Sequence, residues 1–204
     1  FAHNNILDLD LSDCIFLKSL GDHAFDYNHT ENLDLSNCSN LIVIGDHAFG
    51  SHSLLQLDLS DCLAIESIGS WALSASYSSS HNKLIDLNLS GCSNLQSICN
   101  YAFGGNDIVN LDLSECTSLT YIGSKAFYGN KFDSFILPLC EGYEVFGWKD
   151  QNGNFYYGEE TVSDLLSLYY VSYDYILKDE DVEIENGSIQ KCLYNFRFKS
   201  IIIP

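Results

Sequence analysis

Cysteine recurs along most of this chain with a period close to 24 residues. Around five of these cysteines the sequence has the frame Leu-x-Leu-x-x-Cys-x-x-Leu/Ile-x-x-Leu/Ile. Such self-similarity at a fixed period is typical of a solenoid, in which one small unit stacks on its neighbours. The recurring cysteines are 24, 24, 30, 24 and 24 residues apart: Cys14, Cys38, Cys62, Cys92, Cys116 and Cys140.

The residues of one repeat predict its local structure. Leu9-Asp10-Leu11 and its equivalents alternate apolar and polar residues, as in a short strand with one buried face. Stacked repeats would pair these strands into a parallel sheet, with about 4.8 Å between strands. Each repeat then continues as in Gly45-Asp46-His47-Ala48-Phe49. Since Asp, Ser and Asn are favoured helix N-caps, we expect a short helical turn to begin at Asp46 and its equivalents. The single 30-residue step comes from six extra residues within the Ser-rich segment 74–83, which we expect to loop out.

The frame followed by Ile-Gly-x-x-Ala-Phe, as at 44–49 and 122–127, resembles the BspA-like class of leucine-rich repeats. The resemblance covers about residues 1–140. It implies a leucine-rich repeat solenoid with parallel strands on one face and short helical turns on the other. Members of this class are large surface or secreted proteins, mostly bacterial, with adhesion or host-binding roles where roles are known.

The sequence changes character at Glu141. Residues 142–148 alternate like a strand, Asn152-Gly153 is a strong hairpin-turn signal, and residues 165–171 predict another strand. The run GYEVFGWKDQNGNFY followed by LSLYYV resembles the Listeria–Bacteroides repeat, with departures at Phe146 and Ser172. That resemblance implies a small all-β module.

These patterns divide the chain into three parts. We expect about five full repeats in 1–140, a small β module in 141–173, and a β segment in 174–204 that opens a further array. The chain contains no Met, and Phe1 precedes its equivalent Phe25 by one 24-residue period. We therefore expect a piece of a longer protein, truncated within its N-terminal repeat.

The cysteine column does not predict disulfides. Stacked neighbours would be about 4.8 Å apart with parallel Cα–Cβ vectors, whereas a disulfide needs Cβ atoms about 3.5–4.5 Å apart and turned toward each other. Zinc is the alternative, but its four ligands must surround one point, which a straight ladder does not allow. Cys99 and Cys192 add no metal-binding spacing. We therefore expect buried free thiols that hydrogen-bond to loop backbone.

Two rows of polar residues should face outward from the predicted strands. Carboxylates stacked about 4.8 Å apart repel each other even in water. Three interpretations remain open: a solvated polar face, a site for a cationic partner surface, or Ca²⁺ held between the rows. The flat sheet makes Ca²⁺ the least favoured, since Ca²⁺ needs oxygens that converge from several directions. The candidate binding face consists of Asp8, Asp10, Asn32, Asp34, Gln56, Asp58, Asp86, Asn88, Asn110 and Asp112.

Composition and motifs argue against several classes of function. The chain has 28 acidic and 9 basic residues, a net charge of −19, which disfavours nucleic acid and anionic membrane surfaces as partners. No apolar run approaches the roughly 18 residues of a membrane span. The sequence has no phosphate-binding Gly loop, no His-Glu-x-x-His and no Gly-x-Ser-x-Gly. His23 and His47 share a column that later repeats fill with other residue types, which places them on the outer wall. We therefore predict no catalytic residues, no cofactor and no metal site.

The favoured function is a non-enzymatic binding or adhesion protein, extracellular or at the cell surface. Its solenoid face would recognise an extracellular protein or glycan, and a basic partner surface would suit the acidic rows. Two alternatives remain: a structural spacer that displays other domains, and an accessory module of a secreted enzyme.

Overall fold

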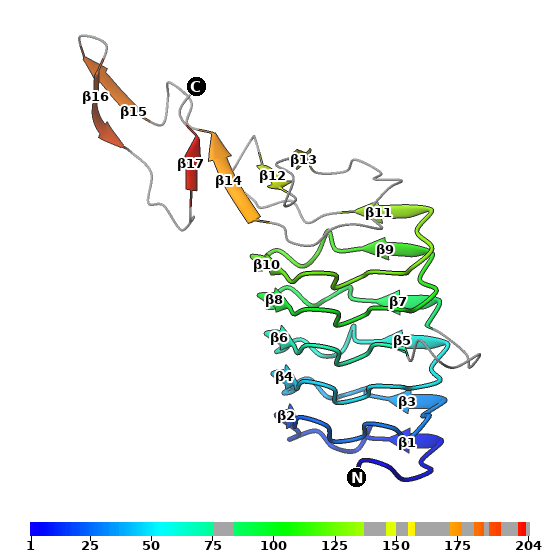
Figure 1. Cartoon of the computed structure of the whole chain (residues 1–204). Helices are drawn as coiled ribbons and strands as arrows, with labels where there is room; N and C mark the ends of the chain where they lie inside the picture. The colour runs from blue at the N-terminus through cyan, green and yellow to red at the C-terminus, as the bar shows by residue number, and fades with distance from the viewer. Residues whose placement is uncertain are drawn as a thin grey trace.

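Residues 1–75 and 84–136 form a stack of coils in the computed structural model (Figure 1). The structure describes residues 1–75, 84–136, 146–149, 155–157, 172–176, 182–185, 188–192 and 200–202. Most of the Ser-rich insertion, residues 76–83, lies outside them. Each coil begins with a three-residue strand: β1 (Asp8–Asp10), β3 (Asn32–Asp34), β5 (Gln56–Asp58), β7 (Asp86–Asn88), β9 (Asn110–Asp112) and β11 (Ser134–Ile136).

Neighbouring coils pair in parallel and in register. Leu9 lies opposite Leu33, and Leu57 lies opposite Leu87, so the six-residue insertion leaves the register of the repeat intact. This confirms the predicted parallel strands. The ladder is interrupted once, because β1 and β3 form one sheet while β5, β7, β9 and β11 form another.

A second parallel sheet, which the sequence pattern did not predict, follows the cysteine in each coil. Its order is β10-β8-β6-β4-β2, with no interruption. Leu20, Ile44 and their equivalents point from it into the core, as expected for that apolar column. The strands are β2 (Ser19–Leu20), β4 (Val43–Ile44), β6 (Ser67–Ile68), β8 (Ser97–Ile98) and β10 (Tyr121–Ile122).

The expected short helical turns are replaced by hydrogen-bonded turns, and the described residues contain no helix. Hydrogen bonds between coils explain the difference. Asp46 Oδ1 accepts from Ser70 N of the next coil at 2.6 Å, rather than capping its own segment. The amide of Phe49 likewise donates to Ala72 O at 2.8 Å. His47, which follows Asp46, has a φ of 54°, which no right-handed α-helix accommodates.

The core lies between the two parallel sheets and the hydrogen-bonded turns. Ala48 and Phe49 are fully buried, as expected, and the Phe25 and Phe49 rings stack with centroids 5.4 Å apart. The buried, hydrogen-bonded thiols predicted for the cysteine column are confirmed at Cys38, Cys92 and Cys116. The prediction is wrong for Cys14, which lies in the first described coil and is exposed. The thiol of Cys38 donates to Leu11 O at 3.3 Å, and that of Cys92 donates to Leu59 O at 3.4 Å.

A buried polar column, formed by Asn28, His52, Asn106 and Asn130, links the coils to one another. Asn106 Oδ1 accepts from Leu84 N at 3.1 Å, and its Nδ2 donates to Leu73 O at 2.8 Å. Each amide thereby satisfies backbone groups that would otherwise be buried without partners.

The C-terminal part is described only as strands. β12 (Phe146–Lys149) pairs antiparallel with β13 (Phe155–Tyr157) and with β14 (Ser172–Ile176). β14 also pairs in parallel with β17 (Ser200–Ile202), and it spans the expected boundary at residue 173. β15 (Val182–Glu185) and β16 (Ser188–Cys192) form an antiparallel pair. The Asn152-Gly153 turn and the predicted strand at 165–171 lie outside the described residues.

Candidate binding face

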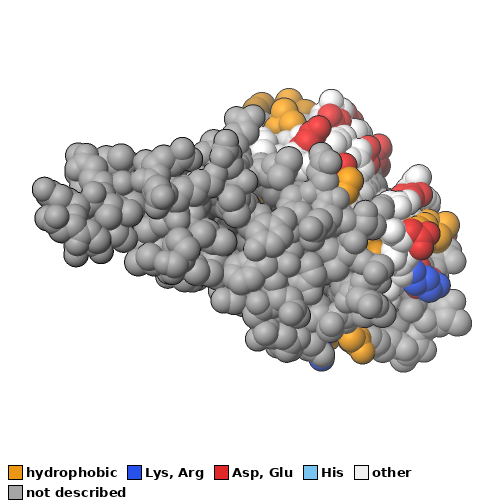
Figure 2. Space-filling view, turned by 90° about the horizontal axis from the view of Figure 1, so that it is seen from above, with side chains coloured by type: hydrophobic (Ala, Val, Ile, Leu, Met, Phe, Trp, Pro, Cys, Tyr) orange, Lys and Arg blue, Asp and Glu red, His pale blue; other side chains and the backbone are white. Residues whose placement is uncertain are grey.

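The ten candidate residues occupy the first and third positions of β1, β3, β5, β7 and β9. All ten are exposed, while the leucine between each pair is turned toward the core, as with Leu57 and Leu111. Seen along the stack, acidic side chains gather on the side of the coils where these strands lie (Figures 1 and 2).

The third-position row has a structural role at the end of each strand. Asp34 Oδ1 accepts from the backbone N of Ser36 at 2.8 Å, and Asp112 Oδ1 accepts from that of Ser114 at 2.8 Å. Asn88 makes the same bond to Ser90 at 3.0 Å. Because an asparagine performs this role equally, the turn requires a side-chain oxygen at this position and not a negative charge.

Amide side chains relieve part of the repulsion along the rows. Asn32 Nδ2 donates to Asp8 Oδ1, and Asn88 Nδ2 donates to Asp58 Oδ1 at 3.0 Å. Asp10 and Asp34, by contrast, lie opposite each other on paired strands with no amide between them. The negative charge is therefore concentrated at the N-terminal end of the face.

A groove of about 440 Å³ lies where the strand ladder is interrupted between β3 and β5. Besides four of the predicted aspartates, it is lined by Glu31 and Asp61, which are not among the predicted residues. Glu31 lies immediately before its strand and Asp61 immediately before Cys62, outside the two columns that the Leu-x-Leu alternation defines. Among the described lining residues, none is Lys or Arg. The six acidic ones are Asp8, Asp10, Glu31, Asp34, Asp58 and Asp61.

A second groove of about 630 Å³ continues the face over β5, β7 and β9. Its polar lining is half amide, with Gln56, Asn88 and Asn110 beside three aspartates. Leucines contribute apolar surface between them, including Leu57 and Leu87. The face thus changes along the stack from strongly acidic to mixed polar and apolar.

Local hydrogen bonds favour the ionised state of the strand-end carboxylates. Hydrogen bonds from the side chain and the backbone of Ser12 lower the pKa of Asp10. Partial burial raises the pKa of Asp58, but hydrogen bonds from Ser60 and Asn88 outweigh it, and the net shift is downward. Among the described residues, no three carboxylates of this face lie close enough to coordinate one ion. The geometry suits a distributed cationic surface better than Ca²⁺.

Comparison with known protein families gives one match. Residues 76–142 match the family model of the BspA type leucine rich repeat region (6 copies). The match supports a BspA-like leucine-rich repeat. Proteins of this repeat class are generally surface proteins that mediate binding or adhesion. No curated protein and no solved structure matches the chain. Among the described residues, no helix is both long and apolar enough to cross a membrane.

Proposed function

We propose that this chain is a non-enzymatic, extracellular or surface-exposed binding protein that recognises a macromolecule through its acidic strand face. The groove between β3 and β5 would form the centre of the contact. The partner is a protein with a basic surface, or a glycan that carries cationic groups. The observation that carries the proposal is the six-carboxylate lining of this groove, located where the strand ladder opens.

The distribution of charge supports a binding role over a merely solvated face. Asn88 performs the strand-end turn without a charge, so Asp34 and Asp58 are not required for folding in their ionised form. Retaining them beside Asp61 adds repulsion that a polar but neutral face would avoid. A partner that brings lysine or arginine side chains would remove that repulsion and gain electrostatic steering.

The C-terminal strands are proposed to belong to further surface-protein modules. The antiparallel pairing of β12 with β13 supports a small β module in 141–173, of the kind that the Listeria–Bacteroides resemblance implies. The segment 174–204 is proposed to open a further array.

The experiment compares two double variants that have the same net charge. Asp34→Asn with Asp58→Asn removes two charges from the groove and preserves the oxygen that each strand-end turn needs. Asp22→Asn with Asp46→Asn removes two charges from the outer turns. There the side-chain oxygens accept backbone hydrogen bonds from the next coil, and Asn100 already serves in the equivalent place. Both pairs are tested against purified extracellular matrix proteins, a glycan array and a Lys/Arg-rich peptide.

We expect the groove variant to bind the recognised partner roughly tenfold more weakly, since it loses two charges and each exposed charge pair contributes up to about 1 kcal/mol. The outer-turn variant should bind like the unaltered chain. If both variants bind equally weakly, binding depends on net charge alone, which would contradict recognition by the acidic strand face. Absence of binding to every probe would favour the spacer alternative.

A further inference from the structure

A column of stacked side chains runs along the outer turns of the solenoid. His23 and His47 occupy equivalent positions in neighbouring coils, with φ of 54° at both. Their rings stack with centroids 4.7 Å apart and planes 8° from parallel. Such left-handed conformations are uncommon for bulky residues. Backbone hydrogen bonds between the coils hold the histidines in this conformation. For example, His23 N donates to Asp46 O at 2.8 Å. The backbone therefore presents two imidazoles side by side in one orientation.

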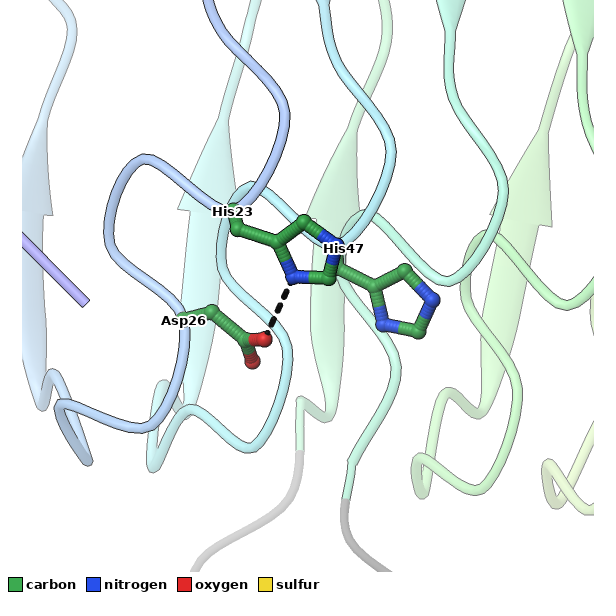
Figure 3. A group of neighbouring side chains, drawn as sticks. All are labelled: His23, Asp26 and His47. Carbon is green, nitrogen blue, oxygen red and sulfur yellow. Dashed lines mark hydrogen bonds and ion pairs between the residues drawn. The ribbon is translucent and has the colours of Figure 1, made fainter. Parts of the chain in front are cut away.

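A buried carboxylate lies beneath this pair of rings (Figure 3). Asp26 Oδ2 lies 2.8 Å from His23 Nδ1, and the Asp26 side chain is only 6% exposed. The absence of a side chain at Gly50 makes room for it, since a Cβ there would lie 2.6 Å from Asp26 Oδ1. The carboxylate is thus held in place by packing as well as by its bond to His23.

The Asp26 carboxylate and the His47 ring make few hydrogen bonds, so both can bind a ligand. Within the part of the chain that the structure describes, His23 is the one residue that hydrogen-bonds to the Asp26 carboxylate. The ring nitrogens of His47 have no hydrogen-bond partner among the same residues. Buried carboxylates ordinarily have several hydrogen bonds or a counter-charge, because leaving one nearly unpaired costs free energy. A cation between Asp26 and the imidazoles would supply what is missing.

We propose that His23, Asp26 and His47 bind a divalent transition-metal ion, with Zn²⁺ as the representative member of the class. One ligand atom from each residue lies within 4.8 Å of the other two. Two imidazole nitrogens and one carboxylate oxygen suit Zn²⁺ and its borderline neighbours, and water completes the coordination. Ligation through His23 Nδ1 needs the tautomer whose ring proton is on Nε2, and the metal then takes the place of the hydrogen bond between His23 Nδ1 and Asp26.

The geometry requires only a small adjustment. Ligand distances near 2.1 Å in a tetrahedral site place ligand atoms about 3.4 Å apart, closer than the present limit of the cluster. The side chain of His23 is 58% exposed, so its ring has space to turn and an ion can reach it from solvent.

The set of ligands occurs once in the described coils. The positions equivalent to His23 and His47 are filled later by Trp71, Tyr101 and Lys125, which do not bind Zn²⁺. The positions equivalent to Asp26 are filled by Gly50, Ser74, Gly104 and Tyr128. The proposed site is also separate from the acidic groove, since none of its three residues lines that groove. Its failure would leave the binding-face proposal untouched.

The test is titration of the whole chain with Zn²⁺ by calorimetry, under reducing conditions. The variants are His47→Gln and Asp26→Asn, and the matched control is His3→Gln. His3 is also an exposed histidine with a positive φ, of 56°, stacked on an aromatic ring, Tyr27, with centroids 4.7 Å apart. A Cys14→Ser variant tests whether the exposed thiol contributes.

We expect one saturable Zn²⁺ site in the unaltered chain, in His3→Gln and in Cys14→Ser. Each cluster variant should bind Zn²⁺ about tenfold more weakly or worse. Replacement of a residue that only hydrogen-bonds to a metal ligand already lowers metal affinity by about that factor. The proposal is overturned if no saturable site exists, if both cluster variants bind as tightly as the control, or if Cys14→Ser abolishes binding.

A second measurement does not depend on the variants folding. Imidazole nitrogen resonances of the unaltered, isotope-labelled chain are followed while Zn²⁺ is added. Those of His23 and His47 should shift together up to one equivalent, while those of His3 and His52 stay in place. Shifts confined to other histidines would reject the site.

Discussion

The side-chain amide of Asn88 donates a hydrogen bond to Asp58 Oδ1 across two neighbouring strands, at 3.0 Å. The same amide accepts from Ser90, through its backbone N at 3.0 Å and its hydroxyl at 2.7 Å. One residue thus ends its strand and also relieves the charge of the strand beside it. The aspartates in the same row can do only the first of these.

We therefore predict that Asn88→Asp lowers stability at low salt. The turn to Ser90 survives, but the donor to Asp58 is lost and two carboxylates face each other. For exposed groups we expect a loss of a few tenths to about 1 kcal/mol in the free energy of unfolding. Urea denaturation at low and high salt measures it, and salt should reduce the difference by screening.

The control for this effect is Asn94→Asp. Asn94 is also an exposed amide that donates to the preceding coil, to Leu63 O at 2.8 Å, but it has no carboxylate opposite. Its replacement adds the same charge and should show a weaker dependence on salt. An equal salt dependence in both variants would contradict the proposed role of the Asp58 contact.

The pH dependence of stability should carry a contribution from His52. This side chain is buried, its Nδ1 accepts from Leu54 N at 3.0 Å, and its Nε2 lies 2.9 Å from Leu73 O. Burial lowers its pKa from 6.5 to about 4, and the bond to Leu73 only partly opposes that shift. The unfolded chain therefore binds a proton between these values while the folded chain does not. The contribution of His52 is complete above pH 6.5 and is lost as the pH falls toward 4, on the order of 3 kcal/mol.

His52→Asn isolates that contribution, because asparagine fills the same buried column at Asn28, Asn106 and Asn130. Urea denaturation of both proteins from pH 7.5 to 4 gives the comparison. We expect the stability of the unaltered chain to fall more steeply over the window 6.5 to 4. Parallel curves for the two proteins would show that His52 is not the titrating group.

The strands were predictable from the sequence because their cause is local. The alternation in Leu9-Asp10-Leu11 specifies one buried face, and the fixed period specifies which residues meet across the ladder. The conformation of the turns was not predictable, because hydrogen bonds between coils determine it. Asp46 is a good N-cap, yet its carboxylate is engaged by Ser70 of the next coil, 24 residues away in the sequence.

The candidate site was predictable to a similar extent. Alternation identified the outward rows, but Leu33 and Leu57 are identical in type, and nothing in them marks the interruption of the sheet between β3 and β5. The cluster at His23 and His47 was missed for a related reason. Its third member, Asp26, belongs to another column, and its burial depends on Gly50 in the following coil.

The cysteine column should divide into reactive and inert thiols. Cys14 is exposed, while Cys62, Cys92 and Cys116 are buried. Burial raises the pKa of each of these three to about 12, with smaller effects of neighbouring carboxylates and, for Cys62 and Cys92, of neighbouring thiols. Because the thiolate is the reactive form, alkylation of the native chain should modify Cys14 before Cys62, Cys92 and Cys116. Peptide mapping by mass spectrometry, with and without denaturant, checks this order. Failure of the buried thiols to react after unfolding would mean that they are not free.

Substitution of a single glycine should have opposite effects in two equivalent places. At Gly69 a Cβ would lie 2.6 Å from Asp46 N and 2.6 Å from Gly45 C, both backbone atoms of the preceding coil. At Gly21 a Cβ would meet nothing within 4 Å. Gly69→Ala must therefore push two coils apart, and we expect a loss of about 1–3 kcal/mol. Gly21→Ala should instead stabilise by about 0.4–1 kcal/mol, since it only reduces the freedom of the unfolded chain. Urea denaturation of the two variants measures both signs. Equal effects of the two substitutions would mean that the close approach of the coils at Gly69 is not what favours glycine at that position.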